Sequence, residues 1–256
     1  MDYSIITKNW QEFNPRDYLR EYYADVGPEN FALLHFAVKA FRRIPPDGLL
    51  LDFGGGPTIL FLIAAAKRVR EIHFCDYLDT NLNEIQQWLN NAPSAFNWHE
   101  FVSVTLGLER QSYGTAPTVL QRETAIRQRV TRVFKCDASN PRPIEEPRTY
   151  DILVTSFCAE SATDNWAQWR RFFRNIVSLL KPNGVLLLTA LKGATCYTVG
   201  EKLFPAVSIR ENDVFQTLIE EGFDSQSLIL ESIPADRPLR QYEGLMVAMA
   251  KKQGDH

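Results

Sequence analysis

The chain of 256 residues carries 28 basic and 31 acidic side chains, which gives a formal net charge of −3 at pH 7. This length suits one α/β domain with a sizeable core, so we expect a single domain over residues 1–256. The near balance of charge, without a basic run, argues against a nucleic-acid partner. No apolar stretch reaches membrane-spanning length, and residues 1–10 lack the apolar core of a signal peptide. We therefore expect a soluble, cytoplasmic monomer with no membrane partner.

Four cysteines are spread widely along the chain, at Cys75, Cys136, Cys158 and Cys196. No two of them form the Cys-x-x-Cys pair that is typical of zinc and redox sites. We expect reduced thiols in the core or at strand ends, with neither a disulfide framework nor a bound metal.

The first predicted element is a short helix that begins after Asn14. Asn14 suits the N-cap, and Pro15 suits the first helical position, where no N–H is needed. Tyr18, Tyr22 and Tyr23 fall along one side of this helix. Two interpretations stay open: the helix packs on the domain, or it is a lid whose phenols close over a ligand.

A second helix is predicted over residues 28–43, and a buried strand over residues 49–53 then runs into a glycine turn. Gly54, Gly55 and Gly56 leave no Cβ in the way, so a ligand can sit against the main chain. Pro57 fits the first turn of an apolar helix that we expect to continue to residue 69. The stretch therefore predicts a cofactor-binding βα turn.

Two classes of cofactor compete for this turn. A dinucleotide fingerprint needs a third glycine where this chain has Ile59. Asp76 ends the next strand, residues 71–76, and suits the acid that binds ribose hydroxyls. The ligand is thus interpreted as a nucleoside that need not carry a pyrophosphate, which S-adenosylmethionine fits better than NAD. The alternative is an ordinary tight turn followed by a surface carboxylate.

A helix over residues 79–91 places Asn81 in its first turn, close to Asp76. Asn81 could help to hold the ribose or the methionine end, or it could be a solvated N-terminal residue of the helix. Residues 106–119, which include Gly107, Gly114 and Pro117, are predicted to be an irregular surface excursion that could form part of a substrate mouth.

The third and fourth strands, residues 132–137 and 150–157, each lead to a carboxylate. Asp137 ends the third strand and is placed to accept a hydrogen bond from an adenine amine. Glu160 follows the fourth strand, at the sheet edge where ligands bind in open α/β folds. Glu160 could contact a cationic substrate, or it could be an N-cap or a solvent-facing acid.

The last third of the chain predicts an aromatic-rich helix, a strand over residues 185–191 and a loop with Tyr197 and Gly200. A helix over residues 211–221 follows. The closing strands, residues 228–233 and 244–250, are joined without room for a crossover helix, so they pair as an antiparallel hairpin. A parallel α/β sheet that finishes in an antiparallel strand is the methyltransferase variant of the Rossmann plan.

The chain resembles the family of small-molecule methyltransferases that includes the nicotinamide, phenylethanolamine, indolethylamine and thioether enzymes. The resemblance covers nearly the whole chain, and its most specific part is Phe13-Asn14-Pro15-Arg16-Asp17-Tyr18-Leu19 with Tyr22-Tyr23. Further matching segments are Asp52-x-Gly54-x-Gly56-Pro57-Thr58, Asp76-Tyr77-x-Asp79-x-Asn81, Lys135-Cys136-Asp137, Ala190-Leu191-Lys192, Tyr197-x-x-Gly200-Glu201 and Glu243-Gly244-Leu245. It implies a Rossmann-like class I methyltransferase fold with a mostly parallel seven-stranded sheet and an antiparallel C-terminal strand.

The resemblance also implies roles for individual residues. The implied cofactor-binding residues are Tyr18, Tyr23, Gly54, Gly55, Gly56, Thr58, Asp76, Tyr77, Asn81, Asp137, Ala138 and Ser156. The implied substrate-binding residues are Phe157, Glu160, Thr189 and Tyr197, with Glu160 and Tyr18 as catalytic residues. Residues 1–27 would form an N-terminal lid segment over the cofactor.

Three positions depart from the nicotinamide enzyme of this family. Thr189 stands where that enzyme has an aspartate, and Gly193 and Ala206 stand where it has serines on the substrate side. The sequence therefore argues against nicotinamide as the acceptor.

We predict an S-adenosylmethionine-dependent N-methyltransferase that acts on a small amine or heteroaromatic and leaves S-adenosylhomocysteine. Amines are mostly protonated at neutral pH, so a carboxylate can bind the ammonium and accept its proton, directly or through water. Glu160 is the candidate for that role. The alternatives are methylation at sulfur, selenium or carbon, a cofactor-binding module without catalysis, and an NAD oxidoreductase.

Overall fold

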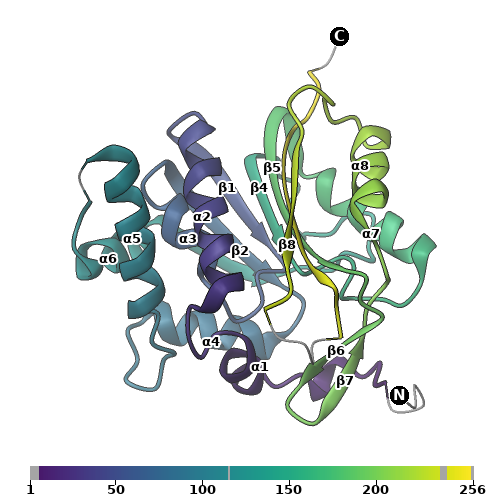
Figure 1. Cartoon of the computed structure of the whole chain (residues 1–256), viewed down its shortest axis with the longest axis horizontal. Coiled ribbons are helices and arrows are strands. Elements are labelled where there is room, and N and C mark those ends of the chain that lie inside the picture. The colour runs from purple at the N-terminus through teal and green to yellow at the C-terminus, as the bar shows by residue number, and fades with distance from the viewer. Residues whose placement is uncertain (1–5, 115, 237–240, 255–256) are drawn as a thin grey trace.

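The computed structural model describes residues 6–114, 116–236 and 241–254, and it is built on a seven-stranded sheet with helices on both faces (Figure 1). The sheet order is β3-β2-β1-β4-β5-β9-β8. Its strands are β1 (Gly48–Phe53), β2 (Val69–Asp76), β3 (Val130–Lys135), β4 (Tyr150–Ser156), β5 (Leu180–Lys192), β8 (Ile229–Pro234) and β9 (Gly244–Lys251). The helices are α1 (Pro15–Tyr22), α2 (Gly27–Arg43), α3 (Leu60–Ala65), α4 (Asp79–Leu89), α5 (His99–Tyr113), α6 (Val119–Arg129), α7 (Trp166–Val177) and α8 (Glu211–Glu220).

Strand direction confirms the predicted sheet. β1, β2, β3, β4 and β5 pair in parallel, whereas β9 runs antiparallel to both β5 and β8. The predicted C-terminal hairpin is the β8–β9 pair. Because the carboxyl ends of the parallel strands meet at one edge, the loops that follow β1 to β4 lie together there.

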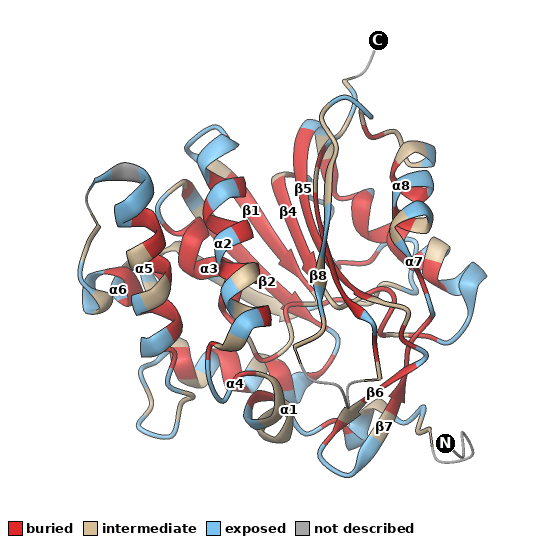
Figure 2. Ribbon diagram, in the orientation of Figure 1, coloured by how far each residue is buried: buried red, intermediate tan, exposed pale blue. Residues whose placement is uncertain are grey.

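The central strands are buried on both faces, as Figure 2 shows. Leu50 of β1 packs into the core beneath α2 to α6, while Leu49 and Leu51 pack into the core beneath α7 and α8. This two-sided burial explains why β1 is a continuous apolar run instead of an alternating pattern. Within the described residues, no helix combines the length and the apolar character needed to span a bilayer.

The predicted irregular excursion over residues 106–119 is wrong. Most of it belongs to α5, which runs from His99 to Tyr113 and packs on α2 and α6. Gly107 lies inside the helix, where a Cβ would meet only open space, so that glycine is not required by the backbone there. No residue of α5 lines the large cavity described below, so this segment does not form a substrate mouth.

Two further local predictions are corrected. The helix expected from residue 58 to 69 is the shorter α3, and Pro57 lies in the turn before it. The loop expected around Tyr197 is a two-stranded hairpin, β6 (Cys196–Val199) with β7 (Lys202–Pro205). Gly200 occupies its turn beside Asp17 of α1, where a larger side chain would collide with the carboxylate.

The N-terminal segment rests on this hairpin. Thr7 N donates to Leu203 O at 2.8 Å, and Trp10 of the short 3-10 helix η2 (Trp10–Glu12) stacks on Phe204 with ring centroids 5.3 Å apart. The predicted start of α1 is confirmed, because the Asn14 side chain accepts hydrogen bonds from the two backbone amides that follow Pro15. The helix is thereby fixed at the carboxyl edge of the sheet.

Candidate functional site

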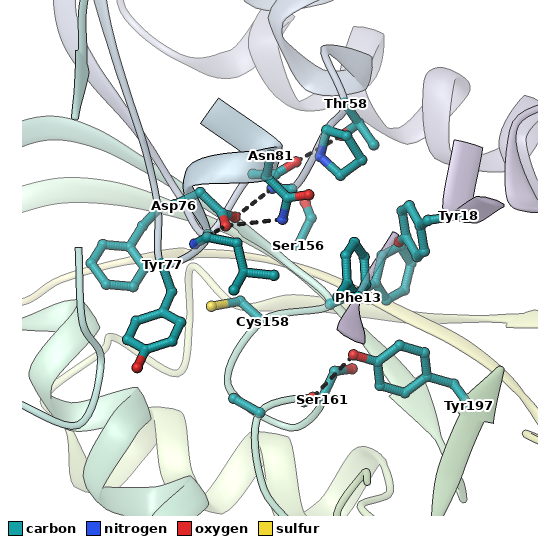
Figure 3. Close-up of a pocket in the computed structure, with 18 of the residues that line it drawn as sticks. Phe13, Tyr18, Thr58, Asp76, Tyr77, Asn81, Ser156, Cys158, Ser161 and Tyr197 are labelled. Atoms are coloured by element: carbon teal, nitrogen blue, oxygen red, sulfur yellow. Dashed lines mark hydrogen bonds between the residues drawn. The ribbon is translucent and has the colours of Figure 1, made fainter. Parts of the chain in front are cut away.

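A cavity of about 320 Å³ opens at the carboxyl ends of β1 to β4 and beneath α1 (Figure 3). Its volume falls within the range of roughly 300–1,000 Å³ that is usual for small-molecule sites. All of the predicted cofactor residues line it, namely Tyr18, Tyr23, Gly54, Gly55, Gly56, Thr58, Asp76, Tyr77, Asn81, Asp137, Ala138 and Ser156. The sheet topology thus brings together side chains from five separate segments.

The three positions of the glycine turn exclude or allow a side chain for different physical reasons. A Cβ on Gly54, which has φ +66°, would overlap the Cys158 sulfur, and a Cβ on Gly55 would overlap the Phe74 ring. Gly56 has φ +62° and faces open space. Packing of the protein itself therefore requires Gly54 and Gly55, whereas Gly56 leaves room on the cavity side.

Asp76 ties the glycine turn to the start of α4. Its Oδ2 accepts from Gly56 N at 2.9 Å, and its Oδ1 accepts from Leu78 N at 2.8 Å and from Asn81 Nδ2 at 3.0 Å, as the dashed lines in Figure 3 show in part. Burial raises the pKa of Asp76. A carboxylate offers about four lone-pair positions, so Asp76 can still accept from a ligand hydroxyl.

Several buried polar atoms of the site lack a hydrogen-bond partner within the described part of the chain. They are Asp52 Oδ1, Asn81 Oδ1 and Ser156 Oγ. Asn81 and Ser156 line the cavity, and Asp52 lies at the end of β1 just before the glycine turn. Burial, and secondly the charge of Asp76, raises the pKa of Asp52 to about 8. Because unpaired buried polar atoms are costly, Asn81 Oδ1 and Ser156 Oγ in the cavity wall indicate a polar ligand.

The third and fourth strands complete this end of the cavity. Asp137 follows β3, and its Oδ1 accepts from Ser139 N at 2.8 Å. Ala138 O accepts from Asn175 Nδ2 at 2.9 Å, which fixes the backbone beside it. Tyr77 is 51% exposed at the rim. Among the described residues, no group of three His, Cys, Asp or Glu side chains is arranged to hold a metal ion.

Aromatic rings cover the cavity. The Tyr18 ring centroid lies 5.3 Å from that of Phe13, 5.0 Å from that of Tyr22 and 5.7 Å from that of Tyr23. Burial raises the pKa of Tyr18 well above its ordinary value and that of Tyr23 to about 12. Both phenols are therefore neutral at pH 7, so they can donate hydrogen bonds and exclude water but do not act as bases.

The predicted substrate residues divide into two pairs. Phe157 and Tyr197 line the cavity, and the Tyr197 hydroxyl donates to Ser161 O at 3.4 Å. Glu160 and Thr189 do not line it and are almost fully buried. Spacing along the chain placed Glu160 at the right edge of the sheet but could not show which way its side chain turns.

Glu160 points into the protein behind the cavity wall. Its Oε1 accepts from Leu191 N at 3.0 Å and from Ser161 Oγ at 3.4 Å. Burial raises the pKa of this carboxyl to about 7. Ser161 itself lines the cavity, so a contact between Glu160 and a ligand would run through that hydroxyl.

Several residues that line the cavity had no role predicted from the sequence. They are Glu29, Asn30, Cys158, Ser161, Tyr242 and Leu245, among others. An acid in the first turn of a helix, such as Glu29, usually stabilises the helix through its dipole. Nothing in the sequence pattern therefore distinguished Glu29 as a residue of the site.

A sheet in this order, with its cavity over the ends of β1 and β2, is the architecture of class I methyltransferases. A family model described as the NNMT/PNMT/TEMT family matches residues 3–253. The chain belongs to this family, and the family predicted from the sequence is confirmed. It is an S-adenosylmethionine-dependent methyltransferase.

Individual relatives agree with this membership. Human nicotinamide N-methyltransferase is 31% identical over 249 residues, which cover 94% of this chain and 93% of that protein. Rabbit (Oryctolagus cuniculus) indolethylamine N-methyltransferase is 32% identical over 253 residues, 95% of this chain and 94% of that protein. Among solved structures, a SAM-dependent methyltransferase from Methanosarcina mazei shares the fold at 13% identity, with a TM-score of 0.56 over 84% of this chain and 96% of its own.

Proposed function

We propose that this protein transfers a methyl group from S-adenosylmethionine to the nitrogen of a small amine or heteroaromatic. The observation that carries the proposal is the division of one cavity into two ends. Asp76 and Asp137, after β2 and β3, mark a polar end for the nucleoside. Phe157, Leu191 and Tyr197 mark an apolar, aromatic end for the acceptor.

The residues present fit S-adenosylmethionine. Asn81 Oδ1 and Ser156 Oγ offer unsatisfied polar atoms to it, and Gly56 leaves open space at the turn. Asp76 keeps lone pairs for the ribose, and Asp137 is the acceptor available to the adenine amine. We assign Tyr77, Thr58 and Ala138 to the walls of the same end.

The chemistry supplied by the bound cofactor is a methyl group on a sulfonium: a bond forms from the acceptor nitrogen to the methyl carbon, the carbon–sulfur bond breaks, and its electron pair stays on sulfur. The protein then has to align the acceptor and exclude water, an effect worth at most about 7–11 kcal/mol. Tyr18 of α1 and Tyr23 at its C-terminal end carry neutral phenols, which are suited to cover the methionine end and keep water out.

The nitrogen must lose a proton, and Glu160 is proposed to receive it. An amine with a pKa near the 10.4 of lysine is mostly protonated at neutral pH. A carboxyl whose pKa is raised to about 7 is a better proton acceptor than an exposed glutamate. The Ser161 hydroxyl, which lines the cavity and donates to Glu160, supplies the path for the proton.

Methylation of a thioether or thiol is the second candidate. One observation favours the thioether: Glu160 is engaged by Leu191 N behind the wall, and a thioether sulfur carries no proton, so its methylation needs no base, whereas a thiol still has to lose its proton. The aromatic lining suits either acceptor.

We further propose one domain over residues 1–256 in which residues 1–27 cover the cofactor, acting as a cytoplasmic monomer. The ring contacts of Tyr18 over the cavity support the covering role. The four cysteines, all in the described part of the chain, are free thiols, which is usual in the cytosol. Large exposed apolar side chains lie on separate elements, as at Phe31 of α2 and Leu120 of α6, so they do not suggest an extended interface.

The deciding experiment is mass-resolved methyl transfer from labelled S-adenosylmethionine to primary amines, pyridines, indoles, thiols and thioethers. Methylated nitrogen products would support the proposal. Product on thiols or thioethers alone would move the assignment to sulfur. A thermal-shift comparison of S-adenosylhomocysteine with NAD accompanies it, because a ligand that binds only the native state raises the melting temperature.

A further inference from the structure

Glu29 is a buried carboxylate in the wall of the cavity. It lies in the first turn of α2, is 8% exposed and lines the cavity. The other acids of the lining are Asp76 and Asp137, which follow β2 and β3. Glu29 is thus the acid of the lining, within the described residues, that does not belong to the nucleoside end.

The hydrogen bonds of Glu29 show on which side it lies. Its Oε2 accepts from the Tyr242 hydroxyl at 2.8 Å, and its Oε1 accepts from Asp236 N at 3.1 Å. Both partners belong to the connection between β8 and β9, and Tyr242 lines the cavity together with Leu245 of β9. In the sheet order, β1, β4 and β5 separate β9 from β2 and β3. Glu29 is therefore held away from the adenine and ribose residues.

Among the described residues, no lysine, arginine or histidine forms an ion pair with this carboxylate. The residues that line the described cavity include no lysine, arginine or histidine. The two groups bonded to Glu29, a phenol and a backbone amide, are neutral, and they leave lone pairs of each oxygen for a ligand. A buried charge without a counter-ion is costly, and electrostatic attraction to an incoming cation is strengthened where water is excluded.

We propose that Glu29, oriented by Tyr242, binds a protonated nitrogen of the methyl acceptor and makes the enzyme selective for cationic amines. This inference rests on the proposed function and names the class of substrate for its acceptor end. A neutral acceptor of the same shape leaves the Glu29 charge unpaired in the cavity, so it is bound less well. Glu29 selects the acceptor, whereas Glu160 is assigned to the later loss of the proton.

The test compares Glu29→Gln with the wild-type protein on two acceptors of similar shape, phenylethylamine and the neutral methyl phenethyl thioether. For phenylethylamine we expect KM to rise at least about tenfold, because a hydrogen bond to a charged group is lost, while kcat changes much less. For the thioether KM should stay the same or fall. The affinity for S-adenosylhomocysteine, measured by calorimetry, should stay within about twofold of the wild type, since Glu29 is assigned to the acceptor.

Two further variants separate this role from a structural one. Glu100→Gln removes an exposed acid in the first turn of another helix, α5, that does not line the cavity, and it should leave both KM values unchanged. Tyr242→Phe keeps the ring but removes the donor to Glu29, and it should raise the phenylethylamine KM less than Glu29→Gln does. Tyr242 is a positioning residue, so its effect should disappear in the double variant.

Several results would overturn the inference. An unchanged phenylethylamine KM in Glu29→Gln, or an equal loss on both acceptors, removes the selective role. Weaker binding of S-adenosylhomocysteine with an unchanged amine KM assigns Glu29 to the cofactor instead. A wild-type protein that methylates only neutral acceptors contradicts the inference but leaves a methyltransferase, whereas a wild-type protein that methylates nothing in the panel contradicts the proposed function as well.

Discussion

The two ends of the cavity are assembled in different ways. The nucleoside end consists mainly of residues at the carboxyl ends of β1, β2, β3 and β4 or in the turns just after them, so the end of a strand fixes most of them. The acceptor end takes Phe157 after β4 and Leu191 of β5 from the sheet, but it also draws on η2, α2, the β6–β7 hairpin and β9, which are far apart in the sequence. The nucleoside end therefore depends mainly on the sheet, whereas the acceptor end depends also on how the elements around the sheet pack.

The largest effect is expected for Gly54→Ala at the nucleoside end. The backbone at φ +66° disfavours a side chain, and the new Cβ would overlap the Cys158 sulfur. Strain of about 1–2 kcal/mol and overpacking of about 1–3 kcal/mol should lower the free energy of unfolding by about 2–5 kcal/mol. Chemical denaturation measures this loss, and calorimetry should find S-adenosylhomocysteine binding abolished.

Matched glycine variants test the reason for that loss. The Cβ added in Gly56→Ala meets no neighbouring atom, so this variant should lower the free energy of unfolding only by the backbone strain of about 1–2 kcal/mol. It should still weaken the binding of the cofactor. Gly107→Ala, in the middle of α5 with open space around it, should be neutral or stabilise by about 0.5–1 kcal/mol. Equal losses in all three variants would contradict the assigned roles of the turn.

Asp76→Asn comes next in expected size. An amide would set an N–H group against the donors Gly56 N, Leu78 N and Asn81 Nδ2, so at least one of the bonds at 2.8–3.0 Å is lost. We expect S-adenosylhomocysteine affinity to fall by about ten- to a hundredfold and stability by about 1–3 kcal/mol. Asp79→Asn is the control, because that exposed carboxylate pairs with Lys135 on the surface. Its loss should lower the free energy of unfolding by less than about 1 kcal/mol.

The buried carboxyl of Glu160, behind the cavity wall, predicts that the stability of the protein depends on pH. Burial raises its pKa from 4.5 to about 7, so the folded protein holds this proton at pH values where the unfolded chain has lost it. Stability therefore falls as pH rises from about 4.5 to about 7, by up to about 3 kcal/mol at 1.36 kcal/mol for each pKa unit. Glu160→Gln should lack this slope, which urea denaturation at several pH values measures.

The same group gives a kinetic prediction. With an amine acceptor, kcat of the wild type should rise with pH through about 7, as Glu160 loses its proton and can accept another. Glu160→Gln should lose this limb of the profile. If the pH profile of kcat is unaltered in the variant, Glu160 has a purely structural role and the proton of the amine is lost to solvent.

The smallest effect is expected for Tyr22→Phe. The Tyr22 hydroxyl donates to Thr198 O of β6 at 2.9 Å, and its removal should cost about 0.5–1.5 kcal/mol. Limited proteolysis should then cut the N-terminal segment faster, while the ring contact with Tyr18 is retained. If cleavage stays as slow as in the wild type, this bond does not hold the segment.

The sequence predicted the nucleoside end of the cavity better than the acceptor end. The strands, their parallel pairing and the β8–β9 hairpin were predictable because apolar runs and short connections restrict the topology. Every predicted cofactor residue lines the cavity, and apart from Tyr18 and Tyr23 of the α1 region this follows because the ends of parallel strands converge regardless of details in the loops. The helix α5 was missed because Gly107 and Gly114 suggest a loop, although one lies harmlessly inside the helix and the other directly follows it.

The acceptor end was predicted less well for a physical reason. Chain spacing identifies that residues 158–161 lie at the cavity, but the direction of each side chain depends on tertiary packing. Ser161 faces the cavity, and Glu160 turns to Leu191 N. Glu29 is held by Asp236 N and by the hydroxyl of Tyr242, which lies 213 residues later in the chain. Such pairs carry no local signature.

The docking of the N-terminal segment on the β6–β7 hairpin has a consequence for the order of events in turnover. Tyr22 of α1 bonds to Thr198, and the adjacent Tyr197 lines the acceptor end, while Tyr18 of the same helix covers the cavity from above. If the segment that we propose as a cover moves away, both ends open together. The methylated product and the spent cofactor are therefore expected to escape through one shared opening, so each should slow the exchange of the other.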